Sequence, residues 1–415
     1  MSIKYLYDRK KIAITYGEQK YSYADVIKYV NYYSEFLDIS KGDRVALMME
    51  NRPESIFSFF SIWAKKGIAL SLDAGYTVEQ LAFVLNDSKP KYIFVSNKVK
   101  EVVEKANEKI GNIVKILVVD EISLPDNYIP KQEEYHNDSD EEVAIIVYTS
   151  GTTGNPKGVM ITYENIRANM DGITAANLVN DTDSILAMLP YHHIMPLCFT
   201  LILPMYLGVP VILLTEISSA SLLKTLQENV VTVILGVPRV WEMLDKAIMT
   251  KINESSLARF MFKMASKINS MSIRKMLFSK VHKQFGGHVR LMVSGGAKID
   301  KNILEDFRTM GFRAIQGYGM TETAPIITFN VPGRERSDSA GEVIKDVEVK
   351  IADDGEILVK GKNVMKGYYN NEQATKEAFD KDGWFHTGDL GRFEGKYLII
   401  IGRKKEMIVL PNGKN

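Results

Sequence analysis

The sequence predicts an α/β fold: two α/β subdomains with mostly parallel sheets flanked by helices in αβαβα layers, then a small β-barrel-like subdomain. Short apolar runs of strand length alternate with helical patterns over residues 1–329. From about Asn330, strand patterns joined by Gly-containing turns replace that alternation. The chain has 415 residues, too many for one ordinary hydrophobic core, so we expect several packed subdomains.

The first α/β subdomain is expected over residues 1–175. Pro53 opens one of its helices, at the position where the missing N–H of proline costs nothing. Strands and helices alternate at a spacing typical of a mostly parallel sheet covered by helices. The predicted strands are 45–48, 92–95, 114–119 and 143–148, the helices are 53–65 and 99–110, and the polar segment 133–142 is an exposed link.

The second α/β subdomain is expected over residues 176–329, with strands 184–188, 211–214, 231–235, 290–293 and 312–315 and helices that include 220–228 and 238–249. Residues 194–214 carry no charge and are long enough for a membrane span. Prolines and a glycine interrupt them, however. We therefore predict no transmembrane span but a buried helix to about Tyr206, a turn at 207–208 and a buried strand.

A small β-rich subdomain is expected over residues 330–402. Its predicted strands are 347–351, 356–360 and 396–401, and its helical signal is confined to 372–379. Such a unit would lie against the two α/β subdomains rather than extend either of them.

Composition narrows the function classes. The 52 Lys and Arg nearly balance the 51 Asp and Glu, which removes the usual electrostatic argument for a nucleic-acid partner. The single cysteine, Cys198, cannot form an intrachain disulfide and fits a reducing compartment. The N-terminal residues show no secretory signal, so we expect a cytoplasmic location.

The strongest local signal is the Gly-rich segment 148–159, Tyr-Thr-Ser-Gly-Thr-Thr-Gly-Asn-Pro-Lys-Gly-Val, expected between a strand and a helix. Its glycines can turn backbone N–H groups inward, its hydroxyls add donors, and Lys157 adds a positive charge for a polyphosphate. Pro156 and Gly158 stand where a Walker A loop needs Gly and Ser or Thr, which disfavours a P-loop NTPase. The alternative is an exposed polar loop without a ligand.

This segment resembles the phosphate-binding signature of the adenylate-forming superfamily, which includes acyl-CoA synthetases, luciferases and peptide-synthetase adenylation domains. The resemblance covers nearly the whole chain. It implies that Lys157 takes part in catalysis and that the segment holds the ATP β- and γ-phosphates. The residues implied in ATP binding here are Thr149, Ser150, Gly151, Thr152, Thr153, Gly154 and Lys157.

A second motif, residues 317–323 (Gly-Tyr-Gly-Met-Thr-Glu-Thr), is expected to follow strand 312–315. It offers an aromatic face, a hydroxyl and a carboxylate within a few residues, although Thr321-Glu322 could equally open a helix. The motif resembles the adenine and magnesium motif of the family. That resemblance implies that Tyr318 stacks on adenine, that Thr321 contacts the α-phosphate and that Glu322 binds Mg²⁺, with the last two counted as catalytic. Gly296, Ala297, Gly317 and Gly319 complete the implied nucleotide contacts on this side.

Two later motifs complete the nucleotide site that the resemblance implies. Residues 384–391 resemble the ribose motif, in which Asp389 accepts hydrogen bonds from both ribose hydroxyls. From the residues alone, an Asp that caps a turn is favoured there. Residues 402–408 resemble the interdomain hinge, with Arg403 reaching the ribose or phosphates and Lys405 at the pivot.

The resemblance also implies a further domain. In the family, a mobile C-terminal domain of about a hundred residues follows the hinge. It carries a lysine that stabilises charge during adenylation, together with half of the CoA site. Residues 403–415 would be only the hinge and the start of that domain, so we expect the sequence to be truncated, with the C-terminal domain absent. The sequence leaves open whether that truncation is natural.

Two more segments suggest which class of carboxylic acid the enzyme would activate. Residues 189–194 (Leu-Pro-Tyr-His-His-Ile) resemble the motif beside the acyl pocket, and residues 236–242 resemble the version found in long-chain acyl-CoA synthetases. The paired histidines could bind a metal, but no third ligand lies nearby in the sequence. The residues that we expect at the acyl pocket are His193, Val237, Trp241, Gly295 and Met320.

The resemblance implies a fatty acid–CoA ligase that uses ATP, Mg²⁺ and coenzyme A. A fatty carboxylate attacks the ATP α-phosphate, giving acyl-AMP and pyrophosphate, and the CoA thiol then displaces AMP. Positioning and charge neutralisation carry the first step, and we expect low activity without the C-terminal lysine. Two alternatives stay open: a ligase that loads an acyl carrier protein, and a non-catalytic nucleotide or fatty-acid sensor. The sequence also leaves open acyl chain length, a homodimer and peripheral membrane contact.

Overall fold

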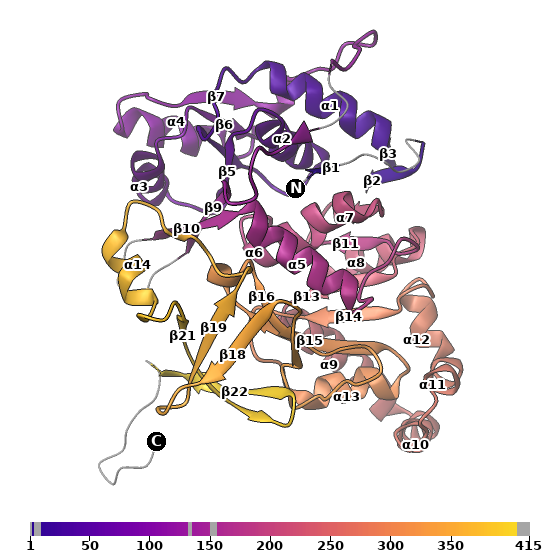
Figure 1. Ribbon diagram of the computed structural model, residues 1–415. Coiled ribbons are helices and arrows are strands. Elements are labelled where there is room, and N and C mark those ends of the chain that lie inside the picture. Colours follow the sequence, from indigo (N-terminus) through magenta and orange to yellow (C-terminus); the bar gives the residue numbers. More distant parts are fainter. Residues whose placement is uncertain (1, 4–9, 132–134, 150–155, 405–415) are drawn as a thin grey trace.

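The computed structural model describes residues 2–3, 10–131, 135–149 and 156–404. It confirms the predicted fold class: two large sheets with helices on their faces, and a four-stranded antiparallel sheet beside them (Figure 1). The predicted elements of the first third are confirmed within one or two residues at each end.

The first sheet has seven strands, and the four neighbouring pairs from β9 to β7 are parallel. Successive residues of a strand point to opposite faces, so each strand contributes to two cores. One face packs on α3 (Val78–Ser88) and α4 (Lys100–Lys109), and the other faces α1 (Tyr23–Glu35) and α2 (Pro53–Ala64). The strand order is β20 (Gly367–Tyr368), β10 (Lys157–Thr162), β9 (Val143–Thr149), β5 (Ile68–Ser71), β4 (Arg44–Met48), β6 (Tyr92–Val95) and β7 (Lys115–Val118).

The second sheet has nine strands and is parallel from β15 to β2. Its order is β17 (Glu342–Val343), β16 (Ile326–Phe329), β15 (Arg313–Gly319), β14 (Leu291–Ser294), β13 (Val233–Gly236), β11 (Ile185–Ala187), β12 (Val211–Leu213), β2 (Ile12–Tyr16) and β3 (Gln19–Ser22). Strands β2 and β3 come from within the predicted first subdomain, while β20 comes from the predicted third and joins the first sheet. The chain thus crosses between sheets, and the boundaries at 175, 329 and 402 stay a proposal.

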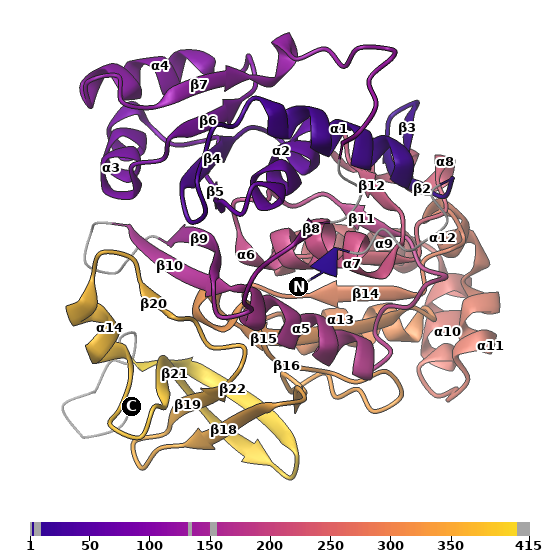
Figure 2. The same ribbon diagram turned by 45° about the horizontal axis from the view of Figure 1, so that its top comes forward.

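The helices complete five αβαβα layers (Figure 2). The largest core lies between the two sheets and includes side chains of α1, α2, α5 (Tyr163–Ala175) and the helical segment 194–207. A second core lies on the outer face of the second sheet. The helices of that face are α8 (Ser219–Glu228), α9 (Pro238–Glu254), α10 (Ser256–Ala265), α11 (Met271–Leu277), α12 (Ser279–Gln284) and α13 (Lys301–Thr309).

The uncharged run 194–214 is folded as predicted. It forms α6 (Ile194–Pro196), a π-helical segment (Leu197–Ile202) and α7 (Leu203–Leu207), turns at Gly208 with φ 67°, and ends in β12. Every side chain from 196 to 205 is buried. Within the described part of the chain, no helix has both the length and the apolar character that crossing a bilayer requires.

The four-stranded sheet is antiparallel throughout, in the order β18 (Val347–Ile351), β19 (Glu356–Gly361), β21 (Phe385–Glu394) and β22 (Tyr397–Arg403), and α14 (Glu372–Ala378) precedes β21. The remaining elements are short: β1 (Ser2–Ile3) paired with β8 (Tyr135–His136), and the 3₁₀ turns Val119–Glu121 and Thr321–Thr323. The register pairs Asp389 with Arg403, so the predicted ribose and hinge residues are neighbours in this sheet.

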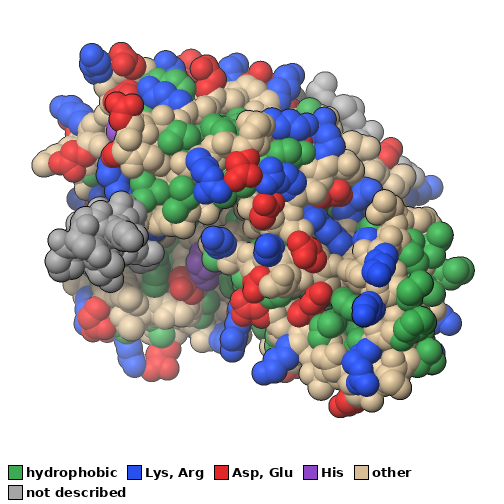
Figure 3. Space-filling view, turned by 90° about the horizontal axis from the view of Figure 1, so that it is seen from below, with side chains coloured by type: hydrophobic (Ala, Val, Ile, Leu, Met, Phe, Trp, Pro, Cys, Tyr) green, Lys and Arg blue, Asp and Glu red, His purple; other side chains and the backbone are tan. Residues whose placement is uncertain are grey.

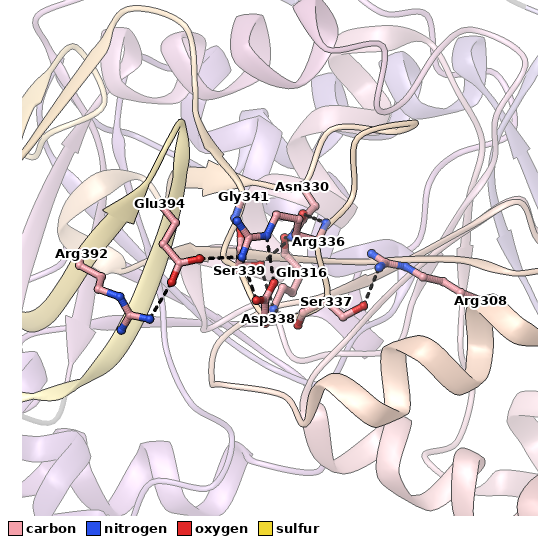
Figure 4. Close-up of polar contacts among 10 residues, drawn as sticks. All are labelled: Arg308, Gln316, Asn330, Arg336, Ser337, Asp338, Ser339, Gly341, Arg392 and Glu394. Atoms are coloured by element: carbon pink, nitrogen blue, oxygen red, sulfur yellow. Dashed lines mark hydrogen bonds and ion pairs between the residues drawn. The ribbon is translucent and has the colours of Figure 1, made fainter. Parts of the chain in front are cut away.

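A polar network fixes the four-stranded sheet on the second sheet (Figure 4). Gln316 on β15 donates through Nε2 to the carbonyl oxygens of Ser337 and Ser339, both at 2.9 Å. Arg336 pairs with Asp338 and, at 2.8 Å, with Glu394 on β21. Because Gln316 and Glu394 belong to the strands that carry Tyr318 and Asp389, the network sets how those two residues face each other.

Candidate functional site

The segment after the Gly-rich motif is a strand, not the predicted helix. Residues 157–162 form β10, which pairs antiparallel with β9 and brings Lys157 opposite Thr149. The helix α5 begins only after Thr162, whose Oγ1 accepts from the Asn165 backbone N–H while Asn165 Oδ1 accepts from the Thr162 N–H. The helix therefore starts later in the chain than predicted, and Thr149 and Lys157 form the hairpin pair next to the segment that connects the two strands.

Several predicted residues fall outside the described residues. In the phosphate segment these are Ser150, Gly151, Thr152, Thr153 and Gly154, and Lys405 at the predicted hinge is another. Their roles remain predictions.

Lys157 and Glu322 both contact Tyr368, a residue that was not among those predicted from the sequence. The Lys157 ammonium is 5.1 Å from the centroid of the Tyr368 ring, and the Tyr368 hydroxyl donates to Glu322 Oε1 at 2.8 Å. Burial raises the pKa of Tyr368, and the Glu322 charge raises it further, so the phenol stays neutral and keeps its proton to donate. Among the described residues, neither Lys157 nor Glu322 takes part in an ion pair. Their charges therefore remain for a ligand.

Backbone pairing places these three side chains. Tyr368 lies on the short strand β20, opposite Val159 of β10. The N–H of Met365, just before β20, donates to the Glu322 carbonyl at 2.8 Å. The 3₁₀ turn that carries Thr321 and Glu322 is thus tied to the same strand that pairs with the phosphate hairpin.

The second motif lies partly within a strand, since β15 continues through Gly319 rather than ending at 315 as predicted. Its glycines allow the close return of β16. A Cβ on Gly319 would be 1.8 Å from the Pro325 carbonyl oxygen, and one on Gly317 would be 3.1 Å from that of Thr328. Any side chain at 319 would push the hairpin apart and displace the turn at Thr321.

Asp389 lies within β21 and not on the predicted turn, and both of its carboxylate oxygens have partners. The Tyr318 hydroxyl donates to Oδ2 at 2.7 Å, and Arg403 Nε lies 2.9 Å from Oδ1. Asp389 is buried, whereas Arg403 is about half exposed. Burial raises the pKa of Tyr318, and the Asp389 charge adds to that effect, so Tyr318 remains a donor.

A second carboxylate, Glu356, supports the Asp389 strand. His386 Nδ1 lies 3.1 Å from its Oε2, the Gly388 N–H donates to Oε1 at 2.9 Å, and Lys404 Nζ donates to Oε2 at 3.0 Å. Burial alone would raise the pKa of Glu356, but these three donors outweigh it and lower that pKa below its ordinary value. His386 thus has a partner within the four-stranded sheet.

The structure does not bring all the predicted acyl residues together. Gly295 and Val237 lie at the ends of β14 and β13, next to Met195 and to Gly296 of the predicted nucleotide contacts: a Cβ on Gly295 would be 2.4 Å from Met195 Sδ, and one on Gly296 would be 3.7 Å from Val237 Cγ1. Trp241 instead lies in the outer core, where its indole packs on the Gly236 backbone. Met320 packs against the core between the sheets. The sequence analysis did not single out Met195.

The two histidines at the start of α6 contact each other through their Nε2 atoms at 3.1 Å. Burial and, to a smaller extent, the neighbouring His193 lower the pKa of His192 to about 4, although Asp73 opposes both effects. Burial also lowers the pKa of His193. Both rings are therefore neutral at pH 7, and within the described residues no three candidate ligands cluster as a metal site would require.

A small cavity lies next to these histidines, between the first sheet and the π-helical segment. Leu197 and Leu201 of that segment line it together with Tyr191, whose buried hydroxyl has no hydrogen-bond partner among the described residues. The other lining residues are Leu47, Met49, Ser55, Phe59 and Ser71. The run 194–203 thus contributes to a cavity at two positions and to core packing at the rest.

Curated relatives include acyl-CoA synthetases. Fatty acyl-CoA synthetase A of Dictyostelium discoideum is 28% identical over 91% of this chain and 63% of its own length. Long-chain-fatty-acid–CoA ligase 1 of Saccharomyces cerevisiae is 32% identical over 68% of this chain and 44% of its own. Luciferin 4-monooxygenase of Nipponoluciola cruciata is 29% identical over 88% and 67%. The chain therefore spans about half to two thirds of these relatives.

Solved structures share the fold and carry nucleotides. The ATP-bound RpMatB-BxBclM chimera B3 is 26% identical with a TM-score of 0.81, covering 97% of this chain and 78% of that one. The o-succinylbenzoate coenzyme A synthetase MenE of Bacillus subtilis, in complex with ATP and magnesium, is 26% identical with a TM-score of 0.78, covering 97% and 79%. The AMP-binding enzyme family matches residues 7–369, most of the sequence. The chain therefore belongs to the AMP-binding family of adenylate-forming enzymes, whose members include acid–thiol ligases.

Proposed function

We propose that this chain is the nucleotide- and acid-binding body of a long-chain fatty acid–CoA ligase. In the proposed reaction, a fatty carboxylate oxygen attacks the ATP α-phosphorus and pyrophosphate leaves. The CoA thiol then attacks the acyl carbonyl carbon and AMP leaves. The observation that carries the proposal is that Lys157 and Glu322 both contact Tyr368, the ammonium over its ring and the carboxylate at its hydroxyl. A cation and a carboxylate brought to one side chain in this way suit a triphosphate and its divalent ion.

The carboxylate of Glu322 fits Mg²⁺. Hard carboxylate oxygens are the ligands that this ion prefers, and among the described residues the Glu322 carboxylate accepts only the one hydrogen bond from Tyr368. When bound, Mg²⁺ would neutralise charge on the phosphate oxygens. In our proposal Lys157 binds the β- and γ-phosphates, Thr321 orients the α-phosphate, and the hairpin amides supply further donors.

The ribose end would orient the nucleoside. Asp389 presents a buried carboxylate next to Arg403, and Tyr318 holds that carboxylate in place through its hydroxyl. In the proposal the ribose hydroxyls donate to Asp389, Arg403 reaches the ribose or phosphates, and the Tyr318 ring lies against adenine. Gly296, Ala297, Gly317 and Gly319 would let the adenine approach the backbone.

The acid class is the finer part of the proposal. Long-chain ligases among the relatives favour a fatty acid, whereas MenE acts on o-succinylbenzoate by its name and another relative is a probable 4-coumarate–CoA ligase. Met195 and Val237 beside Gly295 would form an apolar wall near the reacting carboxylate. Such a wall suits an alkyl chain without selecting its length.

The test compares stable acyl-adenylate analogues. Sulfamoyl adenosines carrying palmitoyl, 4-coumaroyl or o-succinylbenzoyl groups would be titrated by calorimetry, and exchange of radiolabelled pyrophosphate into ATP would be measured with each free acid. We expect the palmitoyl analogue to bind at least about tenfold more tightly than the other two, and palmitate to support exchange. Tighter binding of either other analogue would contradict the fatty-acid assignment. Analogue binding without exchange for any acid, even when a C-terminal domain that carries the family's lysine is added, would favour the non-catalytic sensor.

A further inference from the structure

Helices α10–α12 form a positively charged surface that the overall charge balance hides. Residues 255–284 contain no Asp or Glu and seven basic residues: Arg259, Lys263, Lys267, Arg274, Lys275, Lys280 and Lys283. The whole chain has a formal net charge of only +1. The positive charge is therefore concentrated on one part of the molecule, which we call the α10–α12 arm (residues 255–284).

The same arm exposes large apolar side chains. On α10, Leu257, Phe260 and Met264 are 67%, 62% and 47% exposed, and their spacing of three and four residues places them on one face of the helix. On α11, Ile273 and Met276 are 44% and 67% exposed, and no residue of that helix is buried. A surface that combines such apolar side chains with charge is a mark of a binding surface rather than of ordinary solvent exposure.

The arm is nevertheless firmly packed on its inner side. Ala265 and Phe278 are buried in the outer core. Arg274 donates through Nε to the carbonyl oxygens of Ala265 and Ile268 and through Nη1 to that of Arg308, so its guanidinium holds the arm in shape. The outer apolar side chains are therefore presented by a fixed scaffold.

Two of the remaining basic side chains, Arg259 and Lys275, donate to backbone carbonyl oxygens. Over the part of the chain that the structure describes, no ion pair involves the arm. Lys263 lies on α10 next to Met264, Lys267 follows two residues after the end of that helix, and both are exposed. Positive charge thus lies next to the exposed apolar face.

The arm lies far from the nucleotide site. Figure 1 places α10–α12 at the lower right, whereas α14 and β21 lie at the left, and Figure 2 shows β20 on that left side too. Figure 3 shows hydrophobic side chains gathered on the same right-hand side of the molecule, with Lys and Arg among them. A partner bound there would leave the nucleotide site open.

We propose that the outer face of the α10–α12 arm docks on an anionic lipid surface. Leu257, Phe260 and Met276 would enter the boundary between headgroups and acyl chains, and Lys263 and Lys267 would contact negative headgroups. This is the way amphipathic helices lie in a membrane interface. A nucleic acid would satisfy the lysines but leave these aliphatic side chains in water, so lipid fits both features. This inference does not depend on the proposed function.

The test is co-sedimentation of the protein with vesicles of phosphatidylcholine alone or with added phosphatidylglycerol. We expect at least about tenfold tighter binding to the anionic vesicles, weakened by high salt. The double variants Phe260→Ser/Met276→Ser and Lys263→Glu/Lys267→Glu should each reduce that binding about tenfold. Both change exposed side chains, and unchanged thermal unfolding would show that each variant is folded.

Matched controls are Ile129→Ser, at a side chain that is 79% exposed elsewhere, and Lys98→Glu, at another exposed lysine. Both should leave vesicle binding within about twofold of the unchanged protein. The proposal is overturned if the unchanged protein does not sediment with anionic vesicles, or if the arm variants bind as tightly as the controls. Binding of a short RNA duplex with no binding of vesicles would also overturn it.

Discussion

The two ends of the nucleotide site hold their charges differently. At the phosphate end, Lys157 contacts the ring of Tyr368 and Glu322 accepts from its hydroxyl, and no ion pair joins these two residues, both of which the structure describes. At the ribose end, Arg403 contacts Asp389 directly at 2.9 Å. Opposite charges in direct contact stabilise each other, whereas charges whose contacts are with a neutral group keep their capacity for a ligand. The phosphate end is thus suited to binding charge, and the ribose end to holding a fixed shape.

The two ends of the site also differ in the secondary structure that supports them. The ribose end rests on a continuous antiparallel sheet, on the Glu356 cluster and on the network of Figure 4. The phosphate end rests on the hairpin of β9 and β10 and on the two-residue strand β20. We infer that the ribose end is preformed and that the phosphate end depends more on its ligand. The following predictions test that contrast, from the largest effect to the smallest.

Replacing Glu322 should have the largest effect. Glu322→Gln keeps the size of the side chain but removes its charge, so the divalent ion loses a ligand. We expect pyrophosphate exchange to fall by about 10²–10³-fold, or roughly 3–4 kcal/mol of transition-state stabilisation. Glu348→Gln, at an exposed glutamate, is the control. Exchange within twofold of the unchanged protein would remove Glu322 from the site.

Replacing Asp389 should weaken nucleoside binding regardless of the phosphates. Asp389→Asn leaves Arg403 without its carboxylate and gives the ribose hydroxyls a weaker acceptor. We expect both ATP and AMP to bind about thirtyfold more weakly, near 2 kcal/mol. Calorimetry with both nucleotides measures this. A loss confined to ATP would show that Asp389 acts on the phosphates instead.

Lowering the pH should weaken the interactions of Glu356 that support the ribose end. The folded protein lowers the pKa of Glu356, so this group contributes stability above its unfolded pKa and loses it as pH falls through the folded value. Glu356→Gln should cost about 1–2 kcal/mol of unfolding free energy at pH 7 and much less near pH 3. Denaturant titrations at several pH values measure the difference. A cost that does not change with pH would contradict the charged role of Glu356.

Removing the Tyr368 hydroxyl should have the smallest effect. Tyr368→Phe keeps the ring beneath Lys157 but removes one hydrogen bond to Glu322. We expect exchange to fall about fivefold, near 1 kcal/mol. Tyr368→Leu, which also removes the ring, should lower it further. If Phe and Leu behave alike, the ring contributes nothing to placing Lys157.

Local patterns in the sequence predicted much of this molecule. Strands such as β4, β6 and β9 are apolar runs because they are buried on both faces. A proline at the first turn marks the start of α2 and of α9. The motifs also named residues that the fold brings together, including Asp389 with Tyr318 and Arg403. Each of these patterns involves residues that are close together in the chain, so a single sequence is enough to recognise it.

Features that depend on distant pairing were not predicted. Tyr368 lies 46 residues after Glu322 on a strand of only two residues, too short to leave a pattern. The pairing of β2 with β12 joins segments about two hundred residues apart, which no local signal encodes. The helix predicted directly after the Gly-rich segment is β10 because pairing with β9 outweighs local propensity.

The central claim is that Lys157 and Glu322 bind one Mg²⁺–triphosphate between them. It is tested most directly by comparing ATP and AMP affinities, with Mg²⁺ present, for Lys157→Met, Glu322→Gln and the double variant. We predict that each single variant weakens ATP binding at least about tenfold and leaves AMP binding within about twofold, and that the two losses are not additive. Equal weakening of ATP and AMP, or fully additive losses, would contradict a shared site.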